Sequence, residues 1–426
     1  MKVSLLKNME LKNAGWIIAC KVIQMLLSFV VSVLTARFLG PSNYGLIGYG
    51  TAFVAFFSSI ANLGINSMIV QDCVNEPNDG GCVLGTALVL RVASSIFSAL
   101  AIIGIVGIVD YNEPTTVIVV ALCALALPFQ IFDAFNYWFQ AKYQSKVSSI
   151  AALIAYFFMS VYKIIILILE KDVKWFALAT SLDYICIAVI LFISYKKYNG
   201  PKLRFSKEKA KSLLKRGAPY ILSGMMVAIY GQTDKLMLKQ MLGESSVGYY
   251  SVATAISSMW VFILSAVIDS VKPTIFHLNE KDEEEFNKKN RLLYAIIFYL
   301  SLFVSLLFMI FGKLAIRVFY GEEYMPSVPI LKVVTWYTAF SYLGVARDSW
   351  IICKGKQKYL IFLYMIAAIT NVIMNLFFIP LWGGSGAAWA SLITQIFTSL
   401  ILPFFIKALR PNAKLMLEAI FLRKLN

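Results

Sequence analysis

The feature that most constrains this chain is a series of apolar runs, each about twenty residues long, recurring along the whole sequence. A helix of about twenty residues crosses a hydrocarbon core about 30 Å thick. Charged residues make up 15% of the 426 and hydrophobic residues 59%, whereas a soluble domain has roughly 25% charged residues. The sequence therefore predicts an all-α, polytopic membrane protein.

About twelve spans are predicted. Their approximate limits are 14–36, 43–70, 83–109, 115–139, 147–169, 173–195, 217–240, 247–271, 292–312, 327–352, 359–379 and 385–407. A dense basic run at 195–217 is the one substantial break in the apolar rhythm. We therefore predict four parts: an N-terminal six-helix bundle (1–197), a basic cytoplasmic linker (198–216), a C-terminal six-helix bundle (217–409) and a basic cytoplasmic tail (410–426). The linker is expected to hold a short amphipathic helix at the membrane surface, unless it is simply solvated.

The basic residues, which give a net charge of +16, fall mostly on one side of the predicted membrane. The loops on the side opposite the N-terminus contain few cations, namely Arg37, Lys171, Lys174, Lys313 and Arg317. Because cytoplasmic loops are rich in Lys and Arg, this asymmetry predicts a multi-pass protein with both termini in the cytoplasm. The charge does not indicate a nucleic-acid partner. No cleavable signal peptide is expected, since the first apolar run is too long.

Two short patterns occur twice, in the same order. Leu39-Gly40 and Gly45 reappear as Leu242-Gly243 and Gly248, and WFQAKYQSK at 138–146 resembles WIICKGKQK at 350–358. These matches indicate an internal repeat. Six spans per half would keep both halves in the same orientation, so we expect a pseudo-two-fold axis along the membrane normal. Transporters built from such repeats bind substrate in a central cavity and alternate its access to the two sides.

Ten ionisable residues fall inside the apolar runs, where a charge costs at least about 2.5 kcal/mol unless it pairs or faces water. They are Lys21, Arg91, Asp133, Lys163, Asp183, Asp234, Lys235, Asp269, Arg347 and Asp348. Helical spacing adds Gln24 beside Lys21, and Gln130 and Tyr137 beside Asp133. A polar lumen is the interpretation we favour. The alternative for any one residue is an internal ion pair, for example between Arg347 and Asp133. The deeper residues include several cations, which favours an anionic substrate.

No cofactor, metal site or nucleotide-binding loop is predicted. The six cysteines lack ligand spacing, the single histidine, His277, lies in a charged loop, and no phosphate-binding G-x-x-x-x-G-K-[ST] motif occurs. Transport would therefore draw on an ion gradient, the membrane potential, substrate consumption or a partner ATPase.

Several short motifs along the chain resemble those of polysaccharide-biosynthesis flippases of the multidrug/oligosaccharidyl-lipid/polysaccharide exporter superfamily. They are Lys12-Asn13-x-x-Trp16, the turn from Ala36 to Gly45, Leu63-Gly64, Asp234-Lys235, Phe319-Tyr320-Gly321-x-x-Tyr324, Asn371-x-x-x-Asn375, Ile379-Pro380 and the Gly-Ala run at 383–388. The resemblance covers essentially the whole chain. It implies twelve to fourteen helices in two bundles around a cavity, in the inner membrane. It also implies movement of a polyprenyl-pyrophosphate-linked sugar unit, for O-antigen, capsule or exopolysaccharide, to the outer leaflet.

On this interpretation the cationic lumen for pyrophosphate or acidic sugars consists of Lys21, Arg91, Lys163 and Arg347. Asp133 and Asp269 are candidates for carrying a coupling H⁺ or Na⁺. Gln24, Gln130, Tyr137 and Asp348 complete the polar lumen. The expected partners are the lipid-linked oligosaccharide, membrane lipids, and polymerase and chain-length proteins.

Four alternatives stay open at this stage. A drug or cation antiporter of the same superfamily shares the fold, although it would be expected to place unpaired acids in its cavity. A flippase for lipid II or another cell-wall precursor differs only in cargo. A membrane polysaccharide polymerase or ligase would need a larger external loop than any predicted here. A scaffold of an envelope-synthesis complex would not need a polar lumen.

Overall fold

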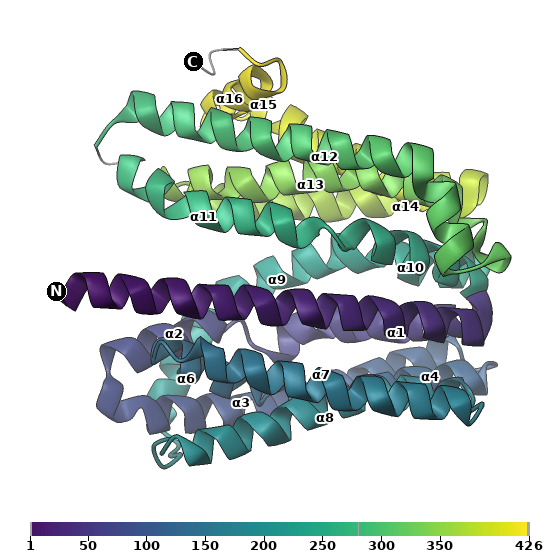
Figure 1. The fold of residues 1–426 in the computed structure, drawn as a ribbon, viewed down its shortest axis with the longest axis horizontal. Coiled ribbons are helices and arrows are strands. Elements are labelled where there is room, and N and C mark those ends of the chain that lie inside the picture. Colours follow the sequence, from purple (N-terminus) through teal and green to yellow (C-terminus); the bar gives the residue numbers. More distant parts are fainter. Residues whose placement is uncertain (1, 280, 424–426) are drawn as a thin grey trace. The chain divides into compact units, whose positions relative to one another are not determined.

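The computed structural model describes residues 2–279 and 281–423, with the side chains of 2–18 and of residue 77 left out of the description. The described chain is mostly α-helical, without a β-strand (Figure 1). The α-helices are α1 (Lys2–Ala61), α2 (Asn66–Asn75), α3 (Gly80–Val109), α4 (Pro114–Ala124), α5 (Ala126–Gln130), α6 (Asp133–Ala141), α7 (Ser145–Ile168), α8 (Val173–Lys197), α9 (Lys207–Leu242), α10 (Glu244–Ser258), α11 (Val261–Asn279), α12 (Glu283–Phe319), α13 (Ser327–Cys353), α14 (Lys358–Ile396), α15 (Leu402–Phe405) and α16 (Arg410–Ile420). Short 3₁₀ turns η1 (Pro77–Asp79) and η2 (Glu322–Tyr324) and a π-helical segment η3 (Phe397–Ile401) connect them.

Nine segments of the described chain are long and apolar enough to cross a membrane. Two of them, Ala19–Asn75 and Lys358–Phe405, each cover two predicted spans, because helices meet there at kinks at Gly40 and Gly383. The predicted seventh span, within α9, is not among the nine, since that stretch contains several polar residues. The prediction of an all-α, polytopic membrane protein is confirmed.

Three predicted spans are divided into shorter helices in the structure. The span at 43–70 is interrupted after Ala61, where Leu63 and Gly64 both have positive φ, and resumes as α2. The span at 115–139 consists of the shorter helices α4, α5 and α6. The span at 247–271 is divided between α10 and α11 at 259–260. Hydropathy averaged over a span does not report such breaks, because the flanking residues keep the mean apolar.

The chain forms two compact units. Unit 1 contains residues 1–39 and 46–228, and unit 2 contains residues 40–45 and 229–426. The boundary between the units falls inside α9, between residues 228 and 229.

Within unit 1, α7 and α8 run side by side (Figure 1), α4 packs on α8, and α2 packs on α6. Its core includes Ile65, Leu84, Phe135, Trp138 and Leu213, all buried. Because Leu213 belongs to α9, the amphipathic start of that helix packs into unit 1.

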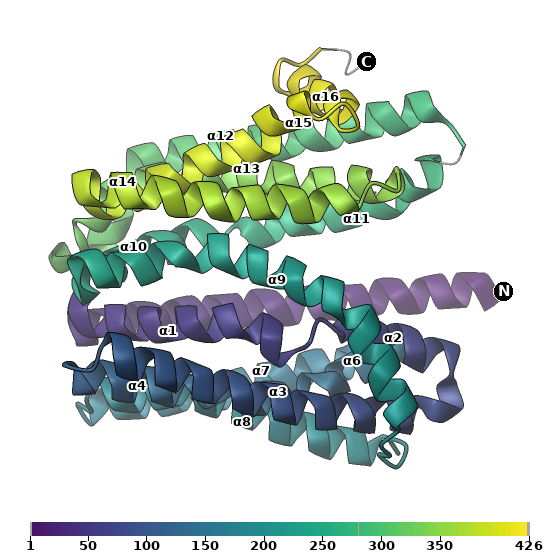
Figure 2. The ribbon, with the colours of Figure 1, turned by 180° about the vertical axis from the view of Figure 1, so that it is seen from behind.

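The linker lies close against α3 and α2 of unit 1. A Cβ on Gly81 or Gly85 would lie 2.3 or 2.4 Å from a linker carbonyl oxygen, so only glycine permits this approach. Two ion pairs fix the start of α9, one from Lys209 to Glu76 at 2.5 Å and one from Arg216 to Asp72 at 2.5 Å. α9 crosses α2 and α3 in the view of Figure 2.

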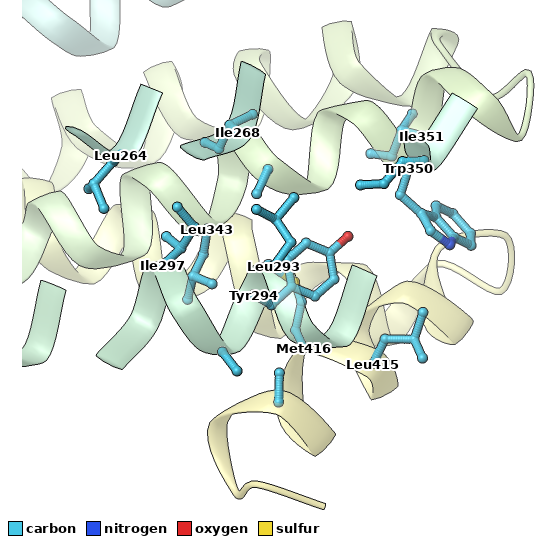
Figure 3. Packing of buried hydrophobic residues seen from close by; sticks show 14 of the residues in the cluster. Leu264, Ile268, Leu293, Tyr294, Ile297, Leu343, Trp350, Ile351, Leu415 and Met416 are labelled. Carbon is cyan, nitrogen blue, oxygen red and sulfur yellow. The ribbon is translucent and has the colours of Figure 1, made fainter. Parts of the chain in front are cut away.

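Unit 2 is built on α12, α13 and α14, with α11 and α16 packed against them. Figure 3 shows its apolar core, in which Ile268, Leu293, Leu343 and Trp350 from three helices meet Met416 of α16. Residues 410–420, predicted as part of a basic tail, thus form a helix with a buried face. The amide of Asn412 donates a 2.6 Å hydrogen bond to the hydroxyl of Tyr294.

The two copies of the repeated glycine turn touch each other inside unit 2. A Cβ on Gly45 would lie 1.9 Å from the carbonyl oxygen of Glu244, and a Cβ on Gly248 would lie 2.0 Å from the carbonyl oxygen of Pro41. The two contacts are equivalent, because Pro41 and Gly45 correspond to Glu244 and Gly248 in the repeat. Such reciprocity is the mark of a local two-fold relationship.

Candidate functional site

Polar side chains inside the apolar helices form three groups, one extended network in unit 1 and two compact sites in unit 2. The side chains of the Lys12-Asn13-x-x-Trp16 motif lie outside the described part of the chain.

The unit 1 polar network includes Arg91, which is fully buried on α3. Its guanidinium hydrogen-bonds the side-chain oxygen of Asn66 on α2 and lies 5.9 Å from the centre of the Tyr137 ring. Asp133, one turn before Tyr137 on α6, interacts with Arg91 electrostatically. The structure therefore brings Arg91, Asp133 and Tyr137 together. The sequence predicted that Asp133 and Tyr137 lie side by side.

The network continues through the break after α1. Gln130 accepts a 3.0 Å hydrogen bond from Ser58, which in turn accepts one of 3.1 Å from Asn62. Asn62 and Asn66 flank the Leu63-Gly64 turn. The break in the second predicted span thus places half-buried polar groups beside the buried side chains of Gln130 and Arg91. Sequence reasoning missed these residues, because amides near a loop give no signal in a charge survey.

The third part of the network is an ion pair between neighbouring helices. Lys163 on α7 lies 2.8 Å from Asp183 on α8, and their side chains are 23% and 21% exposed. Asp183 also interacts electrostatically with Tyr156, which lies on the same face of α7 as Lys163. Lys163 is thus both paired and partly accessible.

The first compact site in unit 2, the Arg347 site, pairs two residues that are neighbours in the sequence. Arg347 donates one hydrogen bond to Asp348 and one to the carbonyl of Thr398, both of 2.9 Å. Tyr364 donates to the other oxygen of Asp348. Thr398 belongs to η3, and π-helical turns free backbone carbonyls from the regular ladder. A small, partly open space of about 30 Å³ adjoins Arg347, Tyr230 and Tyr364, enough for a water molecule.

The second compact site, the Asp234 site, surrounds one carboxylate with hydrogen-bond donors. Asp234 is 3% exposed and accepts hydrogen bonds from Asn371, Asn375, Ser391 and Tyr250. The Asn375 and Ser391 bonds measure 2.7 and 2.6 Å. The motifs Asp234-Lys235 and Asn371-x-x-x-Asn375 therefore meet here.

The remaining predicted site residues lie apart from these groups. Lys21 and Asp269 are exposed, on α1 and α11, and Gln24 is half-buried on α1. Among the deep cations, Arg91, Lys163 and Arg347 each have an acid beside them. The excess of positive charge inferred from the sequence is therefore largely offset locally. Among the described residues, no cluster of His, Cys, Asp and Glu suits a transition metal.

The fold is similar to that of solved transporters, among them members of the MOP superfamily. An inward-facing multidrug resistance transporter of the MATE family matches with a TM-score of 0.70 at 16% identity, over 91% of this chain and 96% of that one. The lipid II flippase MurJ, in an inward closed conformation, matches with a TM-score of 0.67 at 17% identity, over 95% and 90%. At these identities the likeness concerns the fold alone.

Residues 33–329 match the family model described as polysaccharide biosynthesis protein, and the chain belongs to this family. The resemblance found in the sequence is thereby confirmed. The capsular polysaccharide biosynthesis protein CapF of Staphylococcus aureus is 21% identical over 93% of this chain and 99% of its own length. A putative O-antigen transporter of Shigella flexneri is 22% identical over 92% and 96%.

Proposed function

We propose that this protein moves a polyprenyl-pyrophosphate-linked oligosaccharide from the cytoplasmic to the outer leaflet of the inner membrane, for capsule, O-antigen or exopolysaccharide synthesis. The observation that carries the proposal is the unit 1 polar network, in a chain of the polysaccharide biosynthesis family. Its helices are otherwise apolar enough to cross a membrane.

The physical task explains the need for such a network. Each hydroxyl that enters an apolar medium without a hydrogen-bond partner costs roughly 2 kcal/mol or more. An oligosaccharide with a pyrophosphate would face a barrier of many times that amount in bare lipid. Amides, hydroxyls and ion pairs within the helices offer alternative partners, while the prenyl chain stays in the hydrocarbon. We propose that the two units provide this path by alternating access.

The cations differ in what they offer a pyrophosphate. Lys21 is exposed and Lys163 is partly accessible, so we propose that these two bind the anion directly. Arg91 and Arg347 are buried and hydrogen-bonded, so their proposed role is to position neighbouring polar groups.

A coupling H⁺ or Na⁺ would bind at a carboxylate inside a unit. Asp133 keeps this proposed role because it is half-buried beside Arg91. We add Asp234, a buried carboxylate inside unit 2, as a candidate for binding the coupling proton. Asp269 is exposed on α11, which makes it the weaker of the two original candidates.

The test is the leaflet distribution of lipid-linked sugar in cells with the gene deleted and then restored. Build-up on the cytoplasmic face, cleared on restoration, would support the proposal. Normal delivery of units that remain unpolymerised would favour a polymerase instead. Normal delivery and polymerisation, with altered drug resistance, would favour an antiporter.

A further inference from the structure

An apolar groove runs along unit 2 beside the kink of α14. It consists of two adjoining open pockets of about 540 and 680 Å³, which share Ser385 and Trp389. The first is bounded by α12, α13 and α14 and the second by α14 alone. Its aromatic residues are Trp336, Phe340, Phe378, Trp382 and Trp389.

The groove exists because α14 changes direction at Gly383, which has a φ of 58°. A Cβ at the next residue, Gly384, would lie 2.6 Å from the side chain of Ile330. Small residues at the bend thus allow α14 to approach α13 closely, while Trp382 and Trp389 project outward, 55% and 43% exposed.

One cation, Lys332, borders this apolar surface. It lies on α13, five residues after the helix begins, and is half-buried. In the described part of the chain no carboxylate forms an ion pair with it, whereas Arg317, near the same end of α12, pairs with Glu322. A lysine in a membrane span is costly without a partner. Its position among tryptophans fits the level of the lipid headgroups.

One apolar groove with one cation at its side matches an amphiphile with a single chain and an anionic head. A phospholipid has two chains for each phosphate, whereas a polyprenyl phosphate has one. In the predicted orientation, Lys332 lies near the outer face, where the translocated substrate would be released.

We propose that the groove holds the isoprenoid chain of the carrier lipid, with the carrier phosphate on Lys332, in the outer half of the membrane. This inference rests on the proposed function. It adds a lipid-binding site that lies wholly within unit 2 and outside the three polar groups.

The test is binding of synthetic undecaprenyl phosphate to the purified full-length protein in detergent, measured by native mass spectrometry. We expect K332A to weaken binding about tenfold, because a charge-assisted contact with the phosphate is lost. S385F should also weaken binding, by filling the point where the two cavities join. K313A is the matched control, since Lys313 is exposed on α12 near the same end and does not line the groove.

Two further ligands separate the contribution of the phosphate from that of the isoprenoid chain. Polyprenol, which lacks the phosphate, should bind the wild-type protein and K332A equally. An equal concentration of phosphatidylglycerol should not displace undecaprenyl phosphate. Unchanged binding to K332A and S385F, or displacement by phosphatidylglycerol, would overturn the inference.

Failure of this inference is distinguishable from failure of the proposed function. If the wild-type protein binds no undecaprenyl phosphate while gene deletion still traps lipid-linked sugar on the cytoplasmic face, the groove assignment is wrong and the function stands. If deletion leaves the leaflet distribution unchanged, the function fails, and the carrier-lipid assignment fails with it.

Discussion

Gly45 and Gly248, equivalent residues of the sequence repeat, each lie against the backbone that precedes the other. A Cβ on either would come within 2.0 Å of a carbonyl oxygen, of Glu244 or of Pro41. The repeated glycine turn therefore marks the place where its two copies in the chain contact each other. Tyr324, fully buried, packs edge-on against Tyr44 and Tyr249 beside this contact. Burial raises the pKa of Tyr324 above its ordinary value, so its hydroxyl stays neutral.

Replacing either glycine with alanine should prevent stable folding of unit 2. Because the obstacle is backbone rather than a movable side chain, we expect a loss of more than about 3 kcal/mol in the free energy of unfolding. The measurement is the yield of monodisperse protein after purification in detergent. Gly104→Ala is the control, since a Cβ there meets nothing within 4 Å. Equal yields of G45A, G248A and G104A would contradict this explanation of the repeat.

Removing Asp348 should destabilise the protein through Arg347. Arg347 has a side chain only 4% exposed, and its nearest acid is Asp348. Loss of one member of a buried pair typically costs about 3–5 kcal/mol. We expect D348A to lower the thermal unfolding midpoint clearly, and R347A to abolish export while the protein still inserts. Normal polymer export by R347A would refute a role for the Arg347 site.

Variants of the pair Lys163–Asp183 can distinguish a structural role of Lys163 from a role in substrate binding. K163Q should reduce delivery of lipid-linked sugar at least about tenfold, as expected for loss of a charge-assisted phosphate contact. The charge-swapped double variant K163D/D183K should recover the stability but not the delivery. Recovery of both would show that Lys163 only joins α7 to α8.

Asp234 should contribute more to stability than any one of its donors. D234N turns an acceptor of four hydrogen bonds into an amide that meets other donors, so we expect a loss of about 3 kcal/mol or more. S391A should cost about 1–2 kcal/mol. Thermal unfolding of the purified variants gives both values. If D234N unfolds like the wild type but loses its dependence on an H⁺ or Na⁺ gradient, coupling rather than packing is the main role.

The linker contact should be insensitive to pH near neutrality. The hydrogen bond to Glu76 raises the pKa of Lys209 above its ordinary 10.5. The stabilisation from a raised lysine pKa is complete below about 10.5 and is lost only as the pH rises through the higher, folded-state value. Hydrogen exchange of residues 200–210 should therefore stay constant between about pH 6 and 9 once corrected for intrinsic rates. E76Q should speed this exchange, and a transition in the wild type near neutral pH would contradict the assignment.

The sequence alone determined the class of protein and much of its local structure. Apolar runs long enough for a bilayer can fold only as spanning helices, because lipid offers the backbone no hydrogen-bond partners. The glycines of the repeat and the motif order were also readable, since they reflect conformations and close approaches that other residues do not allow. Those features led to the resemblance to polysaccharide-biosynthesis flippases. The match of residues 33–329 to the polysaccharide biosynthesis family confirmed it.

Only the tertiary structure decided which polar residues meet. Hydropathy treated 43–70 as one helix, and only the fold showed the break that brings Asn66 to Arg91 and Asn62 to Ser58. The charge survey counted Arg347, Lys163 and Arg91 as a cationic set, whereas the fold places an acid beside each. It also missed Lys332, whose apolar neighbours come from three helices. Pairing depends on contacts between segments far apart in the chain, and such contacts leave no periodicity in a single sequence.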